Sequence, residues 1–240
     1  MAPWLQSIAG MDRFQDRREA GRQLAARLEV YAGTPEPVVL GLPRGGVPVA
    51  YEVATRLGLP LDVLVVRKIG VPGHSELAMG AIASGGIEVI DPRIVGALAI
   101  PREVFDAVAR RERVELERRE RAFRAGRAPV NVTGKTVILV DDGLATGASM
   151  RAAIDAVRSR EPARVVVAVP VAPPETCQAL RERADEIICL QTPEEMYAVG
   201  LWYEEFGQTT DDEVRQLLDS AARELPARMA ARADKQHAGR

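Results

Sequence analysis

Short runs of consecutive aliphatic residues alternate along this chain with stretches of helical periodicity, and this alternation limits the folds that are open to it. The segments between the runs repeat apolar residues at helical spacing, as in 47–58, 147–159 and 174–183. Strands with no polar face must be buried on both sides, so the pattern predicts an α/β fold with a parallel sheet flanked by helices. The predicted strands are 38–42, 61–68, 136–140, 164–170 and 186–190.

Three other segments have weaker or different patterns. Apolar residues on one helical face predict an amphipathic helix over 13–31. The stretch 102–125 has seven arginines and four glutamates between Arg110 and Arg124. It predicts a solvated helix with i to i+4 ion pairs; a nucleic-acid contact is disfavoured because no aromatic residues are interleaved. Residues 69–86 are rich in glycine, with "AMGAIA" and "IEVI" as candidate short strands.

The domain organisation follows from where the alternation of predicted strands and helices stops. We expect one domain over 1–225, with a core at about 37–190 and a small hood and helix from the terminal segments, at about 193–225. The helix should open at Asp211 and run to about Leu225, with Thr209 or Thr210 as its cap. Residues 226–240 contain few large apolar side chains and predict a frayed tail.

Composition excludes several classes of protein. A formal net charge of -2 gives no sign of a surface for nucleic acid or membrane, and no apolar run reaches the length of a membrane span. The start of the chain lacks a signal-peptide pattern, so we expect a cytoplasmic protein. Cys177 and Cys189 lack CxxC spacing and have only His74 and His237 as histidine co-ligands, which argues against zinc and for core packing in a reducing compartment.

The stretch "VILVDDGLATGAS", 137–149, carries the strongest chemical signal. Two adjacent acids follow a buried strand, although each carboxylate resists desolvation and repels the other. The small residues after them open a helix whose N–H groups can face an anion, and Thr146 adds a hydroxyl. Paired acceptors suit a vicinal diol, so a sugar phosphate satisfies the whole arrangement. An ordinary capped turn explains one acid and Thr146 but not the second acid and both glycines.

Two other phosphate motifs fail on inspection. "GKT" at 134–136 precedes its strand, and Pro129 stands where a P-loop needs its first glycine. "GLPRGG" at 41–46 does not match the GxGxxG spacing of a dinucleotide site, and no suitably placed acid follows.

Four aliphatic residues, two acids and "GLATGAS" resemble the phosphoribosyl-pyrophosphate (PRPP) motif of the type I phosphoribosyltransferases. The resemblance implies that Asp141 and Asp142 hold the ribose 2- and 3-hydroxyls. It also implies a loop around the 5-phosphate, made of Gly143, Leu144, Ala145, Thr146, Gly147 and Ser149. This likeness covers roughly 38–190. "RKIGVPGHSELAMGAI" and "WYEEFGQTTDDEV" extend it over nearly the whole chain to a bacterial subgroup known only as predicted phosphoribosyltransferases.

The same resemblance implies a pyrophosphate site and catalytic residues. Pro43-Arg44-Gly45-Gly46 matches the family's pyrophosphate loop, in which a non-proline cis peptide is common. Arg67 and Lys68 match the basic residues before the family's mobile loop, here 70–80; simple solvation of a strand end is their alternative explanation. Glu76 is the best candidate for a general acid or base. Arg44 and Lys68 are the other two candidate catalytic residues. Glu76 could equally be a solvated loop residue, and His74 is a weaker candidate.

The resemblance constrains less closely the molecule that would accept the ribose phosphate, called the acceptor below. Ala145 stands where enzymes acting on 6-oxopurines have an aspartate, which counts against hypoxanthine and guanine and leaves adenine and uracil open. Four of the chain's ten aromatic residues lie within 197–206. Tyr197, Trp202 and Tyr203 could form a hood that stacks a planar base, and the same clustering equally suits core packing or a dimer contact.

The expected function is therefore a Mg2+-dependent phosphoribosyltransferase of nucleotide metabolism. It would transfer ribose 5-phosphate from PRPP to a nitrogenous acceptor, a nucleobase, and release pyrophosphate. Mg2+ would bind through PRPP and pyrophosphate without a protein metal ligand. The main alternative is a PRPP-binding regulator or sensor without catalysis, and a third is a hydrolase or phosphotransferase acting on a ribose phosphate. The expected partners are PRPP and a small-molecule acceptor, and the sequence is also compatible with a homodimer.

Overall fold

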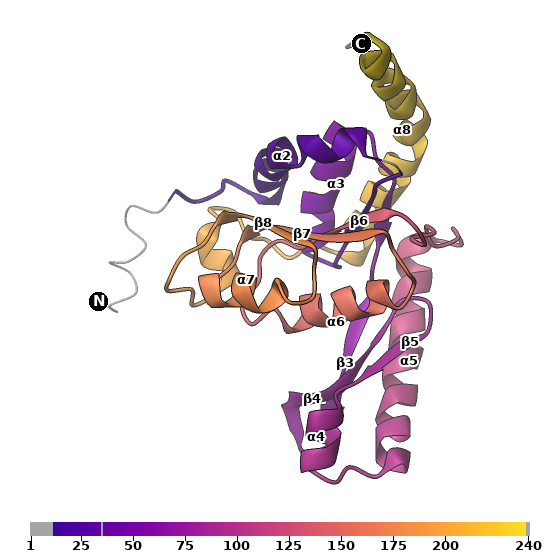
Figure 1. The fold of residues 1–240 in the computed structure, drawn as a ribbon, viewed down its shortest axis with the longest axis vertical. Coiled ribbons are helices and arrows are strands. Elements are labelled where there is room, and N and C mark those ends of the chain that lie inside the picture. Colours follow the sequence, from indigo (N-terminus) through magenta and orange to yellow (C-terminus); the bar gives the residue numbers. More distant parts are fainter. Residues whose placement is uncertain (1–11, 35, 239–240) are drawn as a thin grey trace.

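A five-stranded parallel sheet forms the centre of the computed structural model, which describes residues 12–34 and 36–238 and all their side chains except 75, 76 and 228–238. Its strand order is β2-β1-β6-β7-β8 (Figure 1). The strands are β1 (Val38–Gly41), β2 (Leu61–Val63), β6 (Thr136–Val140), β7 (Arg164–Val171) and β8 (Glu186–Gln191). Every pair in this sheet is parallel, which confirms the predicted fold class.

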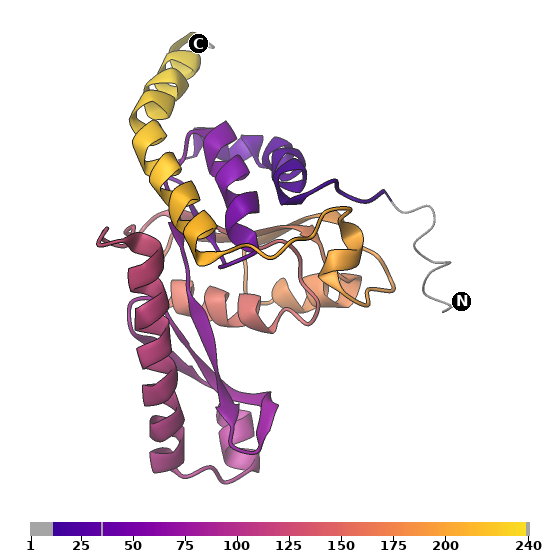
Figure 2. The same ribbon diagram turned by 180° about the vertical axis from the view of Figure 1, so that it is seen from behind.

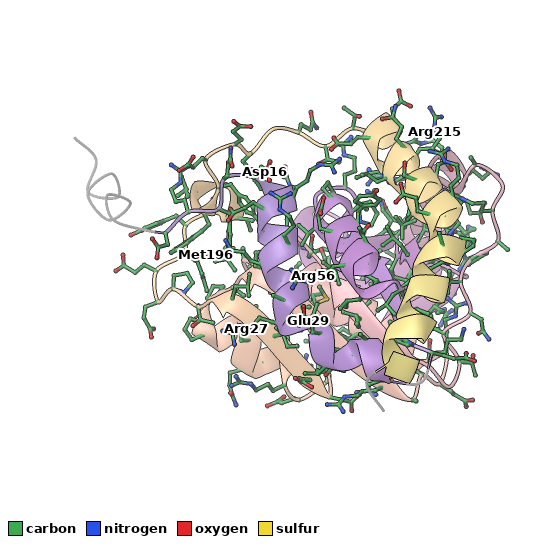
Figure 3. The ribbon with its side chains drawn as sticks, turned by 90° about the horizontal axis from the view of Figure 1, so that it is seen from above. Asp16, Arg27, Glu29, Arg56, Met196 and Arg215 are labelled. Carbon is green, nitrogen blue, oxygen red and sulfur yellow. The ribbon has the colours of Figure 1, made fainter. Side chains whose placement is uncertain are left out.

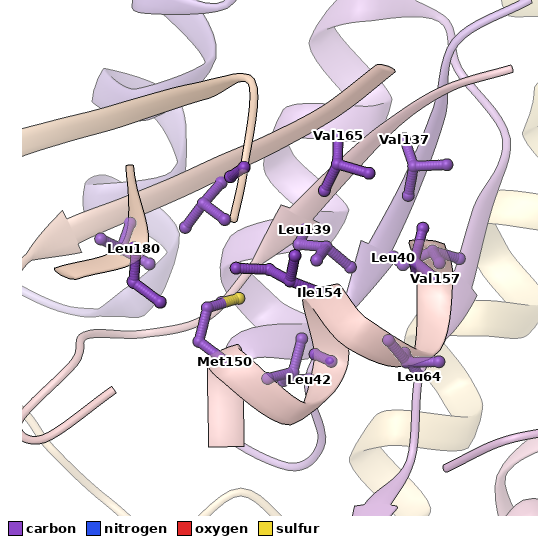
Figure 4. Close-up of a cluster of buried hydrophobic side chains, with 14 of the residues drawn as sticks. Leu40, Leu42, Leu64, Val137, Leu139, Met150, Ile154, Val157, Val165 and Leu180 are labelled. Atoms are coloured by element: carbon purple, nitrogen blue, oxygen red, sulfur yellow. The ribbon is translucent and has the colours of Figure 1, made fainter. Parts of the chain in front are cut away.

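Helices cover both faces of this sheet, as the continuous aliphatic strands require. One face carries α2 (Arg17–Arg27) and α3 (Gly46–Leu57), and the other carries α6 (Ala148–Arg158) and α7 (Pro174–Leu180). Successive side chains of β6 alternate between the two cores. Val137 and Leu139 pack with α6 in the cluster of Figure 4, whereas Ile138 and Val140 pack against the opposite helices.

The N-terminal helix is shorter than the predicted span of 13–31. It begins at Arg17 because the Asp16 carboxylate caps it and accepts a hydrogen bond from Glu19 N at 2.7 Å. Figure 3 shows Asp16 and Arg27 at its two ends, and Glu29, in the short η1 helix (Glu29–Gly33), beside Arg56. Phe14, which lies within that predicted span, instead forms a β-bridge with Tyr203.

The predicted strand over 61–68 is wrong, since the chain changes sheets within it. β2 ends at Val63, and Val66 begins a second, antiparallel sheet of order β3-β4-β5. This sheet comprises β3 (Val66–Val71), β4 (His74–Ala83) and β5 (Ile87–Ile90). The candidate strands "AMGAIA" and "IEVI" are confirmed, but 70–80 forms most of a hairpin rather than an irregular loop. Small residues allow the close packing: a Cβ at Gly80 would lie 2.4 Å from Val89 O.

The second sheet packs with α4 (Pro92–Ala97) and α5 (Arg102–Arg124) in an arm that projects from the main sheet (Figures 1 and 2). Phe105 and Leu116 of α5 are buried against Ile69 and Met79 of the hairpin. The outer side of α5 has i to i+4 ion pairs, among them Arg119 with Glu115 at 2.8 Å, so the prediction of a solvated, ion-paired helix is confirmed.

The last helix, α8, spans Asp211–Ala238 and so continues past the predicted end near Leu225. The expectation of a frayed tail is therefore corrected for 226–238. The sequence there is rich in alanine, arginine and other strong helix formers, which extend a helix without needing a core. Within the described part of the chain, no helix combines the length and the hydropathy that a bilayer crossing requires.

Both cysteines pack in the core, as predicted. Cys177 is buried in the cluster on the α6 side of the sheet, and Cys189 packs against that cluster.

Candidate functional site

Asp141 and Asp142 follow β6 directly, at the carboxyl edge of the parallel sheet, where such folds bind ligands. Both side chains are half-buried, and Asp142 N donates a hydrogen bond to Asp141 Oδ1 at 2.9 Å. Burial raises the pKa of Asp141 well above its usual range, and the neighbouring charge of Asp142 adds to this. The pKa of Asp142 is also raised by burial, against the opposing effect of Arg17. The pair is costly to keep ionised without a ligand or a cation.

Arg17 supplies that cation from the start of α2. Its Nε lies 2.8 Å from Asp142 Oδ2, and its Nη1 donates to Gly207 O at 2.7 Å. The guanidinium also stacks on the ring of Phe206, 3.8 Å from the centroid. No sequence motif marks this residue, because a contact across 125 positions leaves no local signal.

The loop after β1 packs directly on the acid pair. A Cβ at Gly46 would lie 2.7 Å from Val140 O, and one at Gly45 would lie 2.0 Å from Asp142 Oδ2. Only glycine therefore fits at these two positions while the acids keep their places. The peptide bond between Pro43 and Arg44 is cis. Arg44 reaches outward, with Nη1 3.3 Å from Asp211 Oδ1 at the start of α8.

The loop after Asp142 leaves several donors free. Leu144 N donates to Val171 O at 2.9 Å, which fixes the base of the loop. By contrast, the N–H groups of Ala145, Thr146 and Gly147 reach no acceptor among the described residues. Gly147 has a left-handed φ of 68° as it opens α6, and a Cβ there would lie 2.8 Å from Thr176 Cγ2. Ser149 is exposed in the first turn of α6. An anion could bind these donors.

Arg67 and Lys68 follow one another on β3 and so point to opposite faces. Arg67 faces α5, and its Nε donates to Glu112 at 2.9 Å. Lys68 is exposed and has no ion pair with a described residue. Of the two, Lys68 is the side chain that stays free for a ligand.

Glu76 and His74 lie on β4 rather than in an irregular loop. The side chain of Glu76 is outside the described residues.

The aromatic segment is mostly core. Trp202 and Tyr203 are 7% and 1% exposed and pack with Phe14, so burial favours core packing over a stacking platform for these two rings. The hydroxyl of Tyr203 donates to Asp142 O, and burial raises the pKa of Tyr203. The buried Tyr203 thus contacts the backbone of the acid pair from the core side.

Tyr197 differs, being 68% exposed. It borders a cavity of about 540 Å³ that also includes Ala145 and Thr146 of the loop, Glu175 at the start of α7, and Met196. Its lining also includes Arg151 of α6 and Thr176 and Ala179 of α7.

No group of three or more histidine, cysteine, aspartate or glutamate side chains that could hold a metal ion occurs among the residues with described side chains.

Comparisons with known proteins identify relatives of this chain. The family model described as "Phosphoribosyl transferase domain" matches residues 11–203. "Putative phosphoribosyl transferase Rv0571c" of Mycobacterium tuberculosis (strain ATCC 25618 / H37Rv) is 49% identical over 215 residues, which cover 90% of this chain and 48% of that protein. The chain thus spans about half the length of this curated relative.

Two further matches are more limited or purely structural. "Bifunctional protein PyrR" of Chloroflexus aurantiacus is 34% identical over 129 residues, covering 52% of this chain and 65% of that protein. The crystal structure of TT1426 from Thermus thermophilus superimposes with a TM-score of 0.78 at 48% identity, covering 86% of this chain and 97% of that one.

Proposed function

The chain belongs to the phosphoribosyl transferase domain family, and from this premise we propose that it transfers ribose 5-phosphate from PRPP to a nitrogenous acceptor, a nucleobase, and releases pyrophosphate. One observation carries the proposal. The loop 43–46 and the acid pair 141–142, which are far apart in sequence, pack so closely that a Cβ at Gly45 would overlap Asp142. The two halves of the proposed sugar-pyrophosphate site would therefore adjoin.

The sugar and its phosphate would bind at the end of β6. The ribose hydroxyls would donate to Asp141 and Asp142, and such charge-assisted hydrogen bonds offset the desolvation of the acids. The 5-phosphate would accept from the free N–H groups of Ala145, Thr146 and Gly147, with the N-terminus of α6 behind it.

The pyrophosphate would lie toward the loop 43–46. Arg44 is partly exposed, with a side-chain exposure of 39%, and can exchange its contact with Asp211 for a phosphate. Lys68 adds a second free cation, whereas Arg67 is held by Glu112. When bound together with PRPP, Mg2+ would supply charge stabilisation of the leaving group. Carboxylates and a phosphate-bearing substrate are the oxygen ligands that this ion prefers.

The acceptor would enter the cavity beside Ala145. Its volume of about 540 Å³ and the exposed ring of Tyr197 suit a planar base, and the carboxylate of Glu175 can accept from an N–H of that base. In the transfer, the bond from C1 of the ribose to the pyrophosphate oxygen breaks, and a bond from the acceptor nitrogen to C1 forms. The acceptor nitrogen loses its proton, for which Glu76 is the proposed base.

The rival proposal is a PRPP-binding sensor without catalysis. The observation that favours it is the burial of Trp202 and Tyr203, which removes two of the three rings expected to stack a base.

The deciding experiment measures pyrophosphate release by the full chain from PRPP and Mg2+ across a panel of bases and amines. Turnover with an acceptor, lost in Asp141→Asn/Asp142→Asn, supports the transferase. Tight PRPP binding without turnover on any acceptor supports the sensor. The absence of PRPP and ribose 5-phosphate binding in calorimetry would contradict both.

A further inference from the structure

The two cysteines of the chain meet between α7 and β8, at one edge of the main sheet. Cys189 faces α7, because it packs with Ile187 in the cluster on the α6 side of the sheet. Its neighbours Ile188 and Leu190 pack on the opposite face. Cys177 lies on α7 and is buried in the same cluster as Cys189. Both are free thiols, and a hydrogen bond joins their side chains, so the two sulfurs are placed as a disulfide requires.

The two thiols differ in acidity. The hydrogen bond from Cys189 lowers the pKa of Cys177 to about 7, against the effect of burial, and the charge of Arg181 adds to the lowering. Roughly half of Cys177 is therefore thiolate at pH 7. The same hydrogen bond raises the pKa of Cys189, whose Sγ also lies 3.0 Å from Gln191 O. The pair thus combines a nucleophilic thiolate with a neutral thiol beside it.

Access to Cys177 depends on local opening, because its side chain is only 4% exposed. It lies beneath α7, a helix of seven residues, next to the edge strand β8. A short helix at the edge of a sheet opens at a lower free-energy cost than the central core does. A hydroperoxide is small enough to use such an opening, whereas a bulky disulfide is not.

The start of α7 also supports the loop that follows the acid pair. Thr176, the neighbour of Cys177, donates from Oγ1 to Ala145 O at 2.7 Å. Its Cγ2 packs so closely on Gly147 that a Cβ there would lie 2.8 Å away. A covalent bond between two sulfurs is shorter than any non-bonded contact between them, so α7 and β8 must approach each other when it forms. β8 is held by its ladder to β7, so α7 is the element that moves, and Thr176 moves with it.

We propose that Cys177 and Cys189 are a redox-modification site, at which a hydroperoxide converts the two thiols to a disulfide that displaces Thr176 from the loop 143–147. The sequence alone favoured core packing for both cysteines, and no motif joins them to the loop. The effect on ligand binding rests on the proposed function, since this loop would hold the 5-phosphate.

The oxidation takes two steps. The Cys177 thiolate attacks the terminal oxygen of the hydroperoxide, the O–O bond breaks, and the other oxygen leaves and takes up a proton as water or an alcohol. Cys177 is then a sulfenic acid. The Cys189 sulfur attacks the Cys177 sulfur, the S–S bond forms, and the sulfenic hydroxyl leaves with the Cys189 proton as water. The thiols lose two electrons to the hydroperoxide, and exchange with a dithiol restores them.

The test treats the full chain with hydrogen peroxide. Intact mass should fall by two hydrogens, peptide mapping should join Cys177 to Cys189, and dithiothreitol should reverse both changes. Calorimetry should show ribose 5-phosphate binding about fivefold or more weakly to the oxidised chain than to the reduced one, the lower end of ordinary coupling between two sites. Hydrogen exchange at Leu144, whose N–H donates to Val171 O, should become faster in the oxidised chain.

The control variant is Cys177→Ala/Cys189→Ala. Peroxide should change neither its ribose 5-phosphate affinity nor its exchange at Leu144, which separates the disulfide from oxidation of Met150 and Met196 near the loop. Cys189→Ala alone should stop at the sulfenic or sulfinic acid of Cys177. If these variants fold poorly, oxidised and reduced wild type still provide the comparison within one chain.

The outcomes separate this proposal from the preceding one. If peroxide leaves both thiols free, or links cysteines only between two chains, the modification site is wrong while the transferase can stand. If the internal disulfide forms but changes neither ribose 5-phosphate binding nor exchange at Leu144, its connection to the loop is wrong. If wild type binds ribose 5-phosphate in neither state, the proposed function fails, and mass and hydrogen exchange still decide the disulfide.

Discussion

The guanidinium of Arg17 lies 2.8 Å from the carboxylate of Asp142, so a residue near the start of the described chain contacts the acid pair at the end of β6. Both side chains are largely buried, with exposed fractions of 12% for Arg17 and 15% for Asp142. It offsets the effect of burial on the pKa of Asp142. Arg17 thus favours the ionised carboxylate that a ribose hydroxyl would need as an acceptor.

The first prediction concerns this pair. Arg17→Met should raise the pKa of the acid pair further, so protons compete more strongly with ribose 5-phosphate. We expect about threefold to tenfold weaker binding at pH 6, with recovery toward pH 8 as the acids ionise. Calorimetry at pH 6, 7 and 8 measures this. Arg17→Lys, which keeps the charge, is the control. The phosphate of the ligand titrates near pH 6 in every variant, so the difference from wild type is the readout. Parallel pH profiles for Arg17→Met and wild type would contradict the role.

The second prediction tests whether the loop 43–46 and the acid pair are in contact. Gly45 has an ordinary φ of -61°, so alanine is not strained by the backbone there. Its Cβ would lie 2.0 Å from Asp142 Oδ2 and must displace that carboxylate. Gly45→Ala should cost about 1–3 kcal/mol of unfolding free energy and weaken ribose 5-phosphate binding about tenfold or more. Gly33→Ala, where a Cβ meets no atom within 4 Å, should change neither.

The third prediction separates enzyme from sensor through Glu76. If Glu76 takes the acceptor proton, Glu76→Gln should leave PRPP affinity nearly unchanged and slow turnover by about a hundredfold or more. Steady-state kinetics with the acceptor found in the panel, together with PRPP titration, check both parts. Equal turnover by the variant and wild type would leave the transferase in place and remove Glu76 from its mechanism.

The sequence predicted what is encoded locally. The acid pair, its loop and the start of helix α6 lie within one segment of 13 residues, 137–149, and the structure places them as that pattern implies. The strands β1, β6, β7 and β8 were recognisable because a strand buried on both faces is continuously aliphatic.

Other features left no such signal. The break between β2 and β3 falls inside the single aliphatic run that ends at Val66, so periodicity could not mark it. Trp202 and Tyr203 illustrate a second limit, because a buried aromatic cluster and an exposed base platform have the same composition. The contact of Arg17 with Asp142 and Phe206 depends on the folded topology alone.

The fourth prediction concerns a buried ion pair that connects the arm to the main sheet. Arg124 Nε lies 3.0 Å from Asp62 Oδ1, with side-chain exposures of 7% and 9%, and Arg124 Nη2 donates to Val63 O at 2.8 Å. Arg124→Met leaves the Asp62 carboxylate buried without its cation, which should cost about 3–5 kcal/mol of unfolding free energy. Urea denaturation measures the loss. Arg124→Met/Asp62→Asn should recover part of it, and Arg118→Ala, on the exposed side of α5, should stay within about 0.5 kcal/mol of wild type. A loss below about 1 kcal/mol for Arg124→Met would show that the pair is not a structural anchor.

The last prediction is that Asp141 lowers stability in exchange for ligand binding. Burial and the charge of Asp142 raise its pKa in the folded protein above the ordinary value of 3.8. Between these two pKa values the folded state binds more protons than the unfolded state, so wild-type stability should fall as pH rises through this window. Asparagine has no proton to lose and can still accept the hydrogen bond from Asp142 N. Asp141→Asn should therefore be more stable than wild type at pH 7, with the difference shrinking toward pH 4, and should bind ribose 5-phosphate about tenfold or more weakly. Thermal denaturation from pH 4 to 8, with Asp106→Asn on α5 as the control, measures the first part, and calorimetry measures the second. A variant less stable than wild type at pH 7 would show that the ionised carboxylate is stabilised in the free protein, and that the acids do not need a ligand to offset their burial.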